Sequence, residues 1–83
     1  MDSFSTYILF SKSKNKYYVG STNEISRRLT EHNSKQTKST KFGVPWVIVF
    51  EKKFSTKSQA IALEMKIKKR GISRFLIDQN ISG

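Results

Sequence analysis

The chain has 83 residues, enough for one domain, and contains no cysteine, which excludes disulfides and thiolate metal sites. Sixteen Lys and Arg residues against six Asp and Glu give a net charge of +10, which favours a polyanionic partner such as nucleic acid. The longest apolar run, Trp46 to Phe50, is far shorter than a membrane span, so we expect a soluble, cytoplasmic protein that makes no membrane contact.

The N-terminal part of the chain predicts a β-hairpin. Residues 6–11 are apolar and β-prone, which indicates a buried strand. Residues 12–16 are polar and charged, as is typical of a short hairpin loop, and residues 17–20 predict the returning antiparallel strand. Gly20 at its end predicts a tight turn into a helix.

A helix is expected from about residue 24 to 33, because Ser, Thr and Asn at positions 21–23 offer N-cap side chains. Its core stripe consists of Ile25 and Leu29. Residues 34–43 carry Ser, Thr, Lys and Gln without any apolar period, so they predict a mobile basic loop.

The strongest strand signal covers residues 45–51. Its continuous apolar run predicts a strand covered on both faces, either central in the sheet or packed between helices. Thr56, followed by Gln59, forms a capping box for a second long helix, and Gly71 ends that helix.

A short last helix is expected over residues 72–80. The apolar residues expected to turn inward from it are Phe75, Leu76 and Ile77. The element order β-β-α-β-α-α predicts an α+β fold, with helices against a small sheet, in one domain over residues 1–83.

One carboxylate stands on the apolar side of the second long helix. With Ala60 at zero, the 3.6-residue period puts Glu64 at about 40°, inside an apolar arc. That arc consists of Leu63, Ile67, Ile61 and Met65. Carboxylates are rarely buried unless they are paired or bind a metal, so Glu64 predicts either an ion pair with Lys68 or a ligand for a hard divalent cation.

A set of short motifs, in order and at a characteristic spacing, resembles the GIY-YIG nuclease superfamily. The motifs are Thr6-Tyr7-Ile8, Tyr18-Val19-Gly20, Arg28, His32 and Glu64. The likeness covers about residues 6–80 and is closest to the small single-domain bacterial members, which are similar to the N-terminal nuclease domain of an excinuclease. It implies a three-stranded antiparallel sheet flanked by helices.

The resemblance also implies an activity: hydrolysis of DNA phosphodiester bonds, in repair or recombination, with one divalent metal ion, Mg²⁺ or Mn²⁺. Glu64 matches the metal-binding glutamate, and Arg28 matches the arginine that holds the scissile phosphate. Tyr7 and Tyr18 match the paired catalytic tyrosines, and His32 matches a residue that positions or activates the nucleophile. Because tyrosine is a poor base at neutral pH, the general base stays open between Tyr18 and His32.

Further residues are expected to contact the nucleic acid. Gly20 lacks a Cβ and would let backbone approach a phosphate, while Ser21 stands where some relatives have a lysine. The residues expected at this contact are Gly20, Ser21, Lys35, Lys38 and Lys41.

Simpler interpretations stay open. Arg28 can pair with Glu24 on one helix face, and His32 can be a helix C-terminal residue favoured by the dipole. The charge would also suit a nucleic-acid-binding module without catalysis, or a fragment whose DNA targeting comes from a partner. The oligomeric state also stays open.

Overall fold

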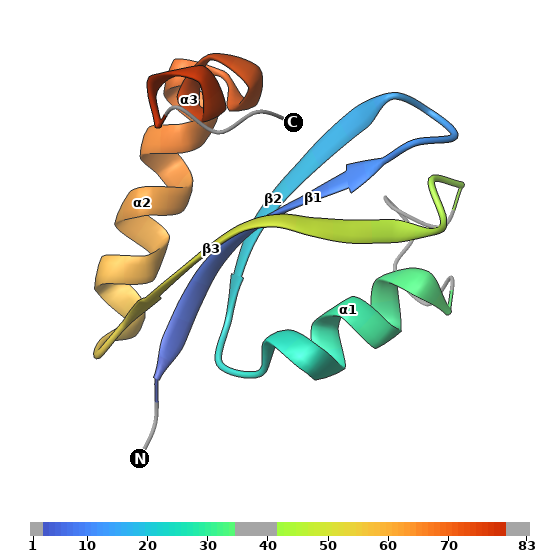
Figure 1. Cartoon of the computed structure of the whole chain (residues 1–83). Helices are drawn as coiled ribbons and strands as arrows, with labels where there is room; N and C mark the ends of the chain where they lie inside the picture. Colours follow the sequence, from blue (N-terminus) through green and yellow to red (C-terminus); the bar gives the residue numbers. More distant parts are fainter. Residues whose placement is uncertain (1–2, 35–41, 80–83) are drawn as a thin grey trace.

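The computed structural model describes residues 3–34 and 42–79, and it has the expected α+β class and element order (Figure 1). The elements are β1 (Phe4–Ser11), β2 (Lys16–Thr22), α1 (Ile25–Asn33), β3 (Trp46–Phe54), α2 (Lys57–Arg70) and α3 (Ile72–Asp78). No helix in the described ranges combines the length and the apolar character needed to cross a membrane.

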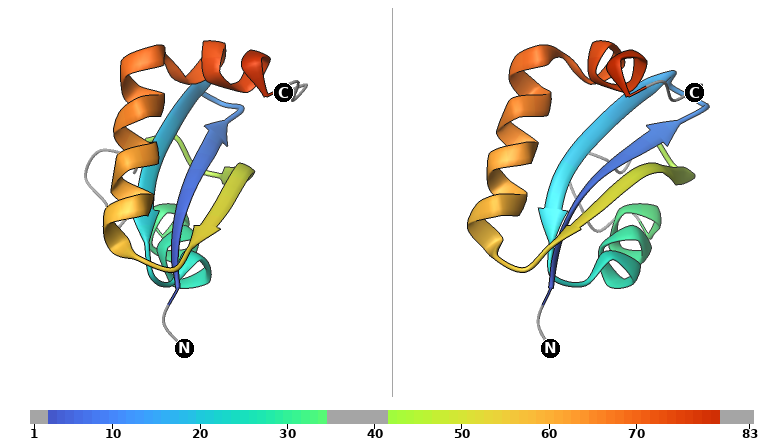
Figure 2. Two further views of the ribbon diagram at one scale, coloured as in Figure 1. Left: turned by 90° about the vertical axis from the view of Figure 1, so that its left-hand side faces the viewer. Right: turned by 60° about the vertical axis from the view of Figure 1, so that its left-hand side comes forward.

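The three strands form one antiparallel sheet in the order β2-β1-β3. Helix α1 lies on one side of this sheet, and α2 and α3 lie on the other (Figure 2). The central strand is therefore β1, and both β2 and β3 are edge strands of the described sheet. This arrangement leaves one long side of β2 without a neighbouring strand in the described part of the chain.

The prediction that β3 is central in the sheet was wrong, and its two faces are covered by helices only in part. Trp46 is buried and Val49 and Phe50 are partly buried, but Val47 and Ile48 are exposed. β3 pairs only with β1, so it lies at an edge of the sheet. Helices α1 and α2 both contact it, but Val47 and Ile48 stay exposed.

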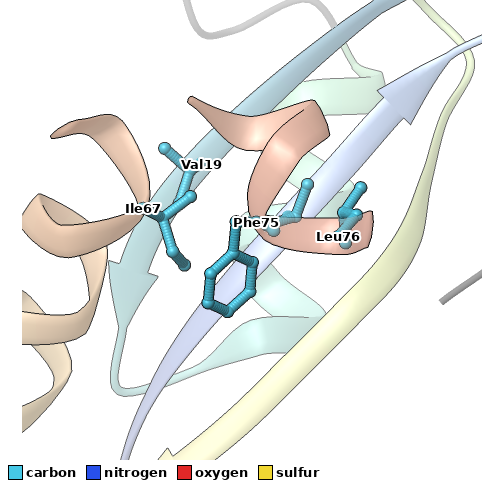
Figure 3. Close-up of a cluster of buried hydrophobic side chains, with 5 residues drawn as sticks. Val19, Ile67, Phe75 and Leu76 are labelled. Atoms are coloured by element: carbon cyan, nitrogen blue, oxygen red, sulfur yellow. The ribbon is translucent and has the colours of Figure 1, made fainter. Parts of the chain in front are cut away.

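The core between the sheet and the helices α2 and α3 is built from buried aliphatic and aromatic side chains (Figure 3). Its members are Ile8, Val19, Ile67, Phe75 and Leu76. Ile77 was expected here as well, but its side chain is 73% exposed. Phe75 and Leu76 fill the inward side of α3, and the next helical step of about 100° carries Ile77 outward.

The long helix α2 begins and ends where the sequence predicts. The Thr56 hydroxyl accepts the backbone N–H of Gln59, as in the predicted capping box, and Gly71 adopts a φ of 96° at the C-cap. The apolar arc is narrower than predicted, however, because Ile61 and Met65 lie outside the packed side and are exposed.

Candidate active site

The register of the first two strands places Tyr7 directly opposite Gly20. Strand β2 continues through Thr22, so Gly20 lies within the strand and the predicted glycine turn was wrong. A Cβ at position 20 would stand 2.7 Å from the Tyr7 hydroxyl oxygen and 2.9 Å from the ring carbon that bears it. The glycine is thus required sterically by the tyrosine ring that crosses it, and its φ is not in the left-handed region.

We expect Gly20→Ala to destabilise the fold by about 1–3 kcal/mol, the usual cost of overpacking a core site. The ring of Tyr7 is fully buried, so it can move aside only if its neighbours or the strand pairing shift. Urea unfolding measures the loss. The cost should shrink in a Tyr7→Leu background, where the blocking ring is gone, and an equal cost in both backgrounds would contradict this explanation.

Three aromatic side chains meet between the sheet and α1. Tyr7 Oη lies 3.2 Å from His32 Nε2. The rings of Tyr18 and His32 have centroids 4.9 Å apart, and those of Tyr7 and Tyr18 are 6.4 Å apart. Tyr17 lies on the opposite face against Phe10, as strict alternation along the strand predicts.

His32 is completely buried, which differs from an ordinary exposed residue at the end of a helix. It comes from the last turn of α1, whose Ile25 and Leu29 pack against the same cluster. Asn33 fixes this end of the helix, because its side-chain oxygen accepts the N–H of Trp46 and its amide donates to the Trp46 carbonyl. No sequence signal indicates this clamp, since an Asn near a helix C-terminus is common.

Burial sets the protonation states of the Tyr7–His32 pair. Burial raises the pKa of Tyr7 above its usual value; the nearby Arg28 guanidinium opposes this rise, and the charge of Glu64 adds to it. Burial also lowers the pKa of His32, and the positive charge of Arg28 lowers it further. At neutral pH the pair therefore consists of a protonated phenol beside a neutral imidazole that can accept its hydrogen bond.

We expect an NMR titration of His32, the single histidine in the sequence, to give a pKa below 6.5. Below pH 6.5 the unfolded chain binds a proton that the folded one resists, so stability falls as the pH drops through this window. Arg28→Gln should raise the His32 pKa, because it removes a neighbouring positive charge. A His32 pKa at or above 6.5 in the parent protein would show that the imidazole is not buried in solution.

Arg28 projects from α1 beside this cluster. Its Nη1 lies 2.7 Å from Oε1 of Glu31, so the acidic partner of Arg28 on this helix is Glu31 and not Glu24, which the sequence had left open as an alternative. Glu24 instead stands at the N-cap, without a side-chain cap of its own, and the Thr22 hydroxyl accepts its backbone N–H. The Arg28 side chain is 30% exposed and lines an open hollow, so part of its guanidinium is accessible.

Glu64 approaches from α2, on the other side of the sheet. The Ser21 hydroxyl donates to its Oε1 at 2.8 Å, and Lys68 Nζ lies 2.8 Å from its Oε2. The side chain of Glu64 is 17% exposed, whereas that of Lys68 is 58% exposed. The ion pair that the sequence offered as an alternative is therefore present, together with a second partner on the strand.

Two open hollows meet at Ser21, near the C-terminal end of β2. The first, about 330 Å³, is lined by residues that include Arg28, Thr22 and Lys57. The second, about 630 Å³, is lined by residues that include Glu64 and Lys68. Because β2 is an edge strand, side chains from both faces of the sheet reach this end. Lys57 was missed in the sequence, although it shares a flank of α2 with Glu64.

A divalent cation fits the donor set around Glu64 only with help from outside the chain. No group of three Asp, Glu, His or Cys side chains gathers within residues 3–34 and 42–79. Mg²⁺ commonly uses one or two carboxylates and completes its shell with water and phosphate oxygens. The exposed Lys68 ammonium can swing away from Glu64, whereas Ser21 can keep the carboxylate in place.

The predicted site residues thus fall into four groups. Tyr7, Tyr18, Arg28 and His32 gather on the α1 side, and Ser21 and Glu64 meet on the α2 side. Gly20 lies beneath the Tyr7 ring between them. The predicted contact residues outside the described part of the chain are Lys35, Lys38 and Lys41.

Comparison with known proteins agrees with the resemblance that the motifs indicate. Residues 3–74 match the GIY-YIG catalytic domain. A UPF0213 protein of Staphylococcus haemolyticus is 39% identical over 64 residues, which cover 75% of this chain and 78% of that protein. An uncharacterized protein of Acanthamoeba polyphaga mimivirus is 34% identical over an alignment of 92 positions, which covers 99% of this chain but only 55% of that protein.

A solved structure resembles the fold as well. The solution NMR structure of the UPF0213 protein BH0048 from Bacillus halodurans superposes with a TM-score of 0.57 and 26% sequence identity. The match covers 93% of this chain and 84% of that one. Since the family domain spans most of the chain and the motifs lie on the expected elements, this chain belongs to the GIY-YIG nuclease family.

Proposed function

We propose that this chain is a divalent-metal-dependent endonuclease that hydrolyses phosphodiester bonds in DNA, with repair or recombination as its setting. The observation that carries the proposal is the approach of Arg28 and Glu64 to Ser21 from opposite faces of the sheet. A cationic fork and a carboxylate on either side of one strand end can hold a phosphate and a cation next to each other.

Arg28 is the phosphate ligand in this proposal. Its guanidinium presents a planar fork of donors that matches two phosphate oxygens, which fixes the orientation of the bond to be cut. Glu31 Oε1 accepts a hydrogen bond from Arg28 Nη1 at 2.7 Å, so the side chain loses less freedom when the phosphate binds. Lys57 lines the same hollow and adds a second positive charge.

His32 and Tyr7 handle protons in this proposal. Hydrolysis forms a bond between a water oxygen and phosphorus and breaks the bond between phosphorus and the leaving oxygen; the water loses a proton, and the leaving oxygen takes one up from solvent. The neutral His32 imidazole can accept a proton from the Tyr7 hydroxyl at 3.2 Å, and Tyr7 can in turn accept one from the attacking water. The pair thereby supplies a base although the Tyr7 pKa is raised, because the phenol passes its proton on.

Glu64 would hold the cation, with water and substrate oxygens as the remaining ligands. A bound Mg²⁺ or Mn²⁺ neutralises the negative charge that develops on the phosphate during hydrolysis. The Ser21 hydroxyl orients the carboxylate through its 2.8 Å hydrogen bond.

A second candidate function is favoured by the ion pair between Glu64 and Lys68. In that state the carboxylate already has a positive partner in the chain, as in a basic nucleic-acid-binding module without catalysis. Both candidates predict salt-sensitive binding to nucleic acid, and only the first predicts cutting.

Incubation of the purified protein with supercoiled plasmid DNA tests the proposal. We expect nicked and linear products with Mg²⁺ or Mn²⁺ and none with a chelator. A parallel incubation with RNA establishes which nucleic acid is cut. Binding without any cleavage, whichever of the two metals is present, would support the second candidate and refute the first.

A further inference from the structure

The outer flank of α2 carries an unusual mixture of apolar and basic side chains. Viewed down the axis of α2, the residues at angles of about 40° to 180° from Ala60 form one continuous strip on the helix surface. In order of angle they are Glu64, Lys57, Lys68, Ile61, Met65, Ser58 and Lys69. We call the five apolar and basic residues of this set, which are Lys57, Lys68, Ile61, Met65 and Lys69, the α2 flank.

Two large apolar side chains of this flank face solvent. Met65 is 65% exposed and Ile61 is 37% exposed, although the sequence predicted both in the apolar arc of the helix. The opposite side of α2 is filled by Ala60 and Ile67, which are buried. Scattered exposed apolar residues are normal, but these two are one helical turn apart and line one hollow together with Glu64.

The charges around this apolar pair define what can bind there. Lys68 and Lys69 line the same hollow, and Lys57 lies on the neighbouring hollow with Arg28. A complementary ligand is therefore anionic at its ends and has an apolar face in the middle. A nucleotide whose base is turned out of the stack has this chemistry, with phosphates for the lysines and a base face for Met65 and Ile61.

We propose that the α2 flank binds an unstacked nucleotide next to the bond to be cut, so that the preferred substrate is DNA with unpaired or distorted nucleotides. A regular duplex hides its base faces inside the stack and offers the flank only phosphates. Methionine and isoleucine are among the side chains that proteins insert between base steps to unstack them. The proposal rests on the proposed endonuclease function, since it names the substrate of the same site.

The test compares a fully paired duplex with the same duplex carrying a short internal mismatch, with binding measured in the presence of a chelator so that nothing is cut. We expect the parent to bind the mismatched duplex more tightly. Met65→Gln keeps the length of the side chain but removes its apolar end, and should weaken binding to the mismatched duplex about tenfold, with little change for the paired one. Ile61→Gln should act in the same direction.

Ile77→Gln is the matched control, because Ile77 is similarly exposed but lies on α3 outside both hollows. It should leave both affinities unchanged. A 2-aminopurine base placed at the mismatch gives a second readout, since its fluorescence should rise on binding to the parent and not to Met65→Gln.

Equal affinity of the parent for both duplexes, or equal loss in Met65→Gln and Ile77→Gln, would overturn this inference while leaving a cleavage activity intact. Absence of cleavage with either metal would overturn the endonuclease proposal instead. The comparison of binding to the paired and the mismatched duplex would still test the inference in that case. If Met65→Gln dissociated a dimer of the chain in sedimentation, the flank would be a self-association surface and the inference would be wrong.

Discussion

Glu64→Gln is expected to lower the rate of DNA cleavage by about 100- to 1000-fold, the range found when one group that stabilises transition-state charge is removed. Glutamine keeps the size of the side chain and its hydrogen bond with Ser21, but it carries no charge with which to hold a cation. Affinity for DNA should stay near that of the parent or rise, because a negative charge is removed from a basic surface.

The expected change in stability is small. Glu64 pairs with Lys68 four residues later on α2, and such pairs contribute only a few tenths of a kcal/mol. Cleavage and urea unfolding, measured on the same preparations, therefore separate the two interpretations of Glu64. If the carboxylate serves only the helix, Glu64→Gln cuts DNA at the parental rate.

Asp78→Asn is the matched control for this substitution. Asp78 also pairs with a basic residue, because Arg70 Nε lies 2.7 Å from its Oδ2, but this pair joins α2 to α3 outside both hollows. The variant removes one negative charge and one ion pair, as Glu64→Gln does. We expect its cleavage rate to equal that of the parent, which would assign the effect at Glu64 to position rather than to net charge.

The fold was predictable because local signals agreed with the packing. Thr56 with Gln59, and Gly71 after the last helical turn, marked both ends of α2, and alternation placed Tyr17 and Tyr18 on opposite faces. The failures came where exposure depends on the neighbours of an element rather than on its own pattern. The apolar run of β3 could not reveal that it lies at the sheet edge.

The site was predictable in part for the same reason. The motif resemblance predicted which residues form the site, and helical periodicity predicted which face of α2 carries Glu64. The contacts between elements could not be predicted: the pairing of Ser21 with Glu64 joins residues far apart in sequence. Nor did any pattern indicate that the Tyr7 ring, rather than a phosphate, fills the space above Gly20. These contacts depend on strand register and on how α2 sits against β2.

Arg28→Lys is expected to reduce the cleavage rate about 100-fold while the protein keeps its net charge, since loss of one preorganised donor group has about this effect. A lysine ammonium supplies the charge but not the planar fork that binds two phosphate oxygens. It also loses the geometry of the 2.7 Å contact with Glu31. Single-turnover cleavage at saturating protein measures the effect on chemistry apart from binding.

Arg27 provides the control within the same helix. Its side chain is 62% exposed, and its Nε lies 3.8 Å from Glu31 Oε2, so Arg27 and Arg28 share one acidic partner. Only Arg28, however, lines the hollow at Ser21. Arg27→Lys should therefore cut DNA at the parental rate.

The neutral variants separate catalysis from general attraction to DNA. Arg28→Gln should reduce the salt dependence of DNA binding by about one unit of slope, the contribution of one phosphate contact, in addition to abolishing cleavage. Arg27→Gln should change the slope little, because its charge is exposed and far from a fixed phosphate. If Arg28→Gln and Arg27→Gln reduced the salt dependence of DNA binding equally and lowered the cleavage rate equally, Arg28 would act only through the overall positive charge. The chain would then fit the non-catalytic binding module, in which no single guanidinium has a defined phosphate to hold.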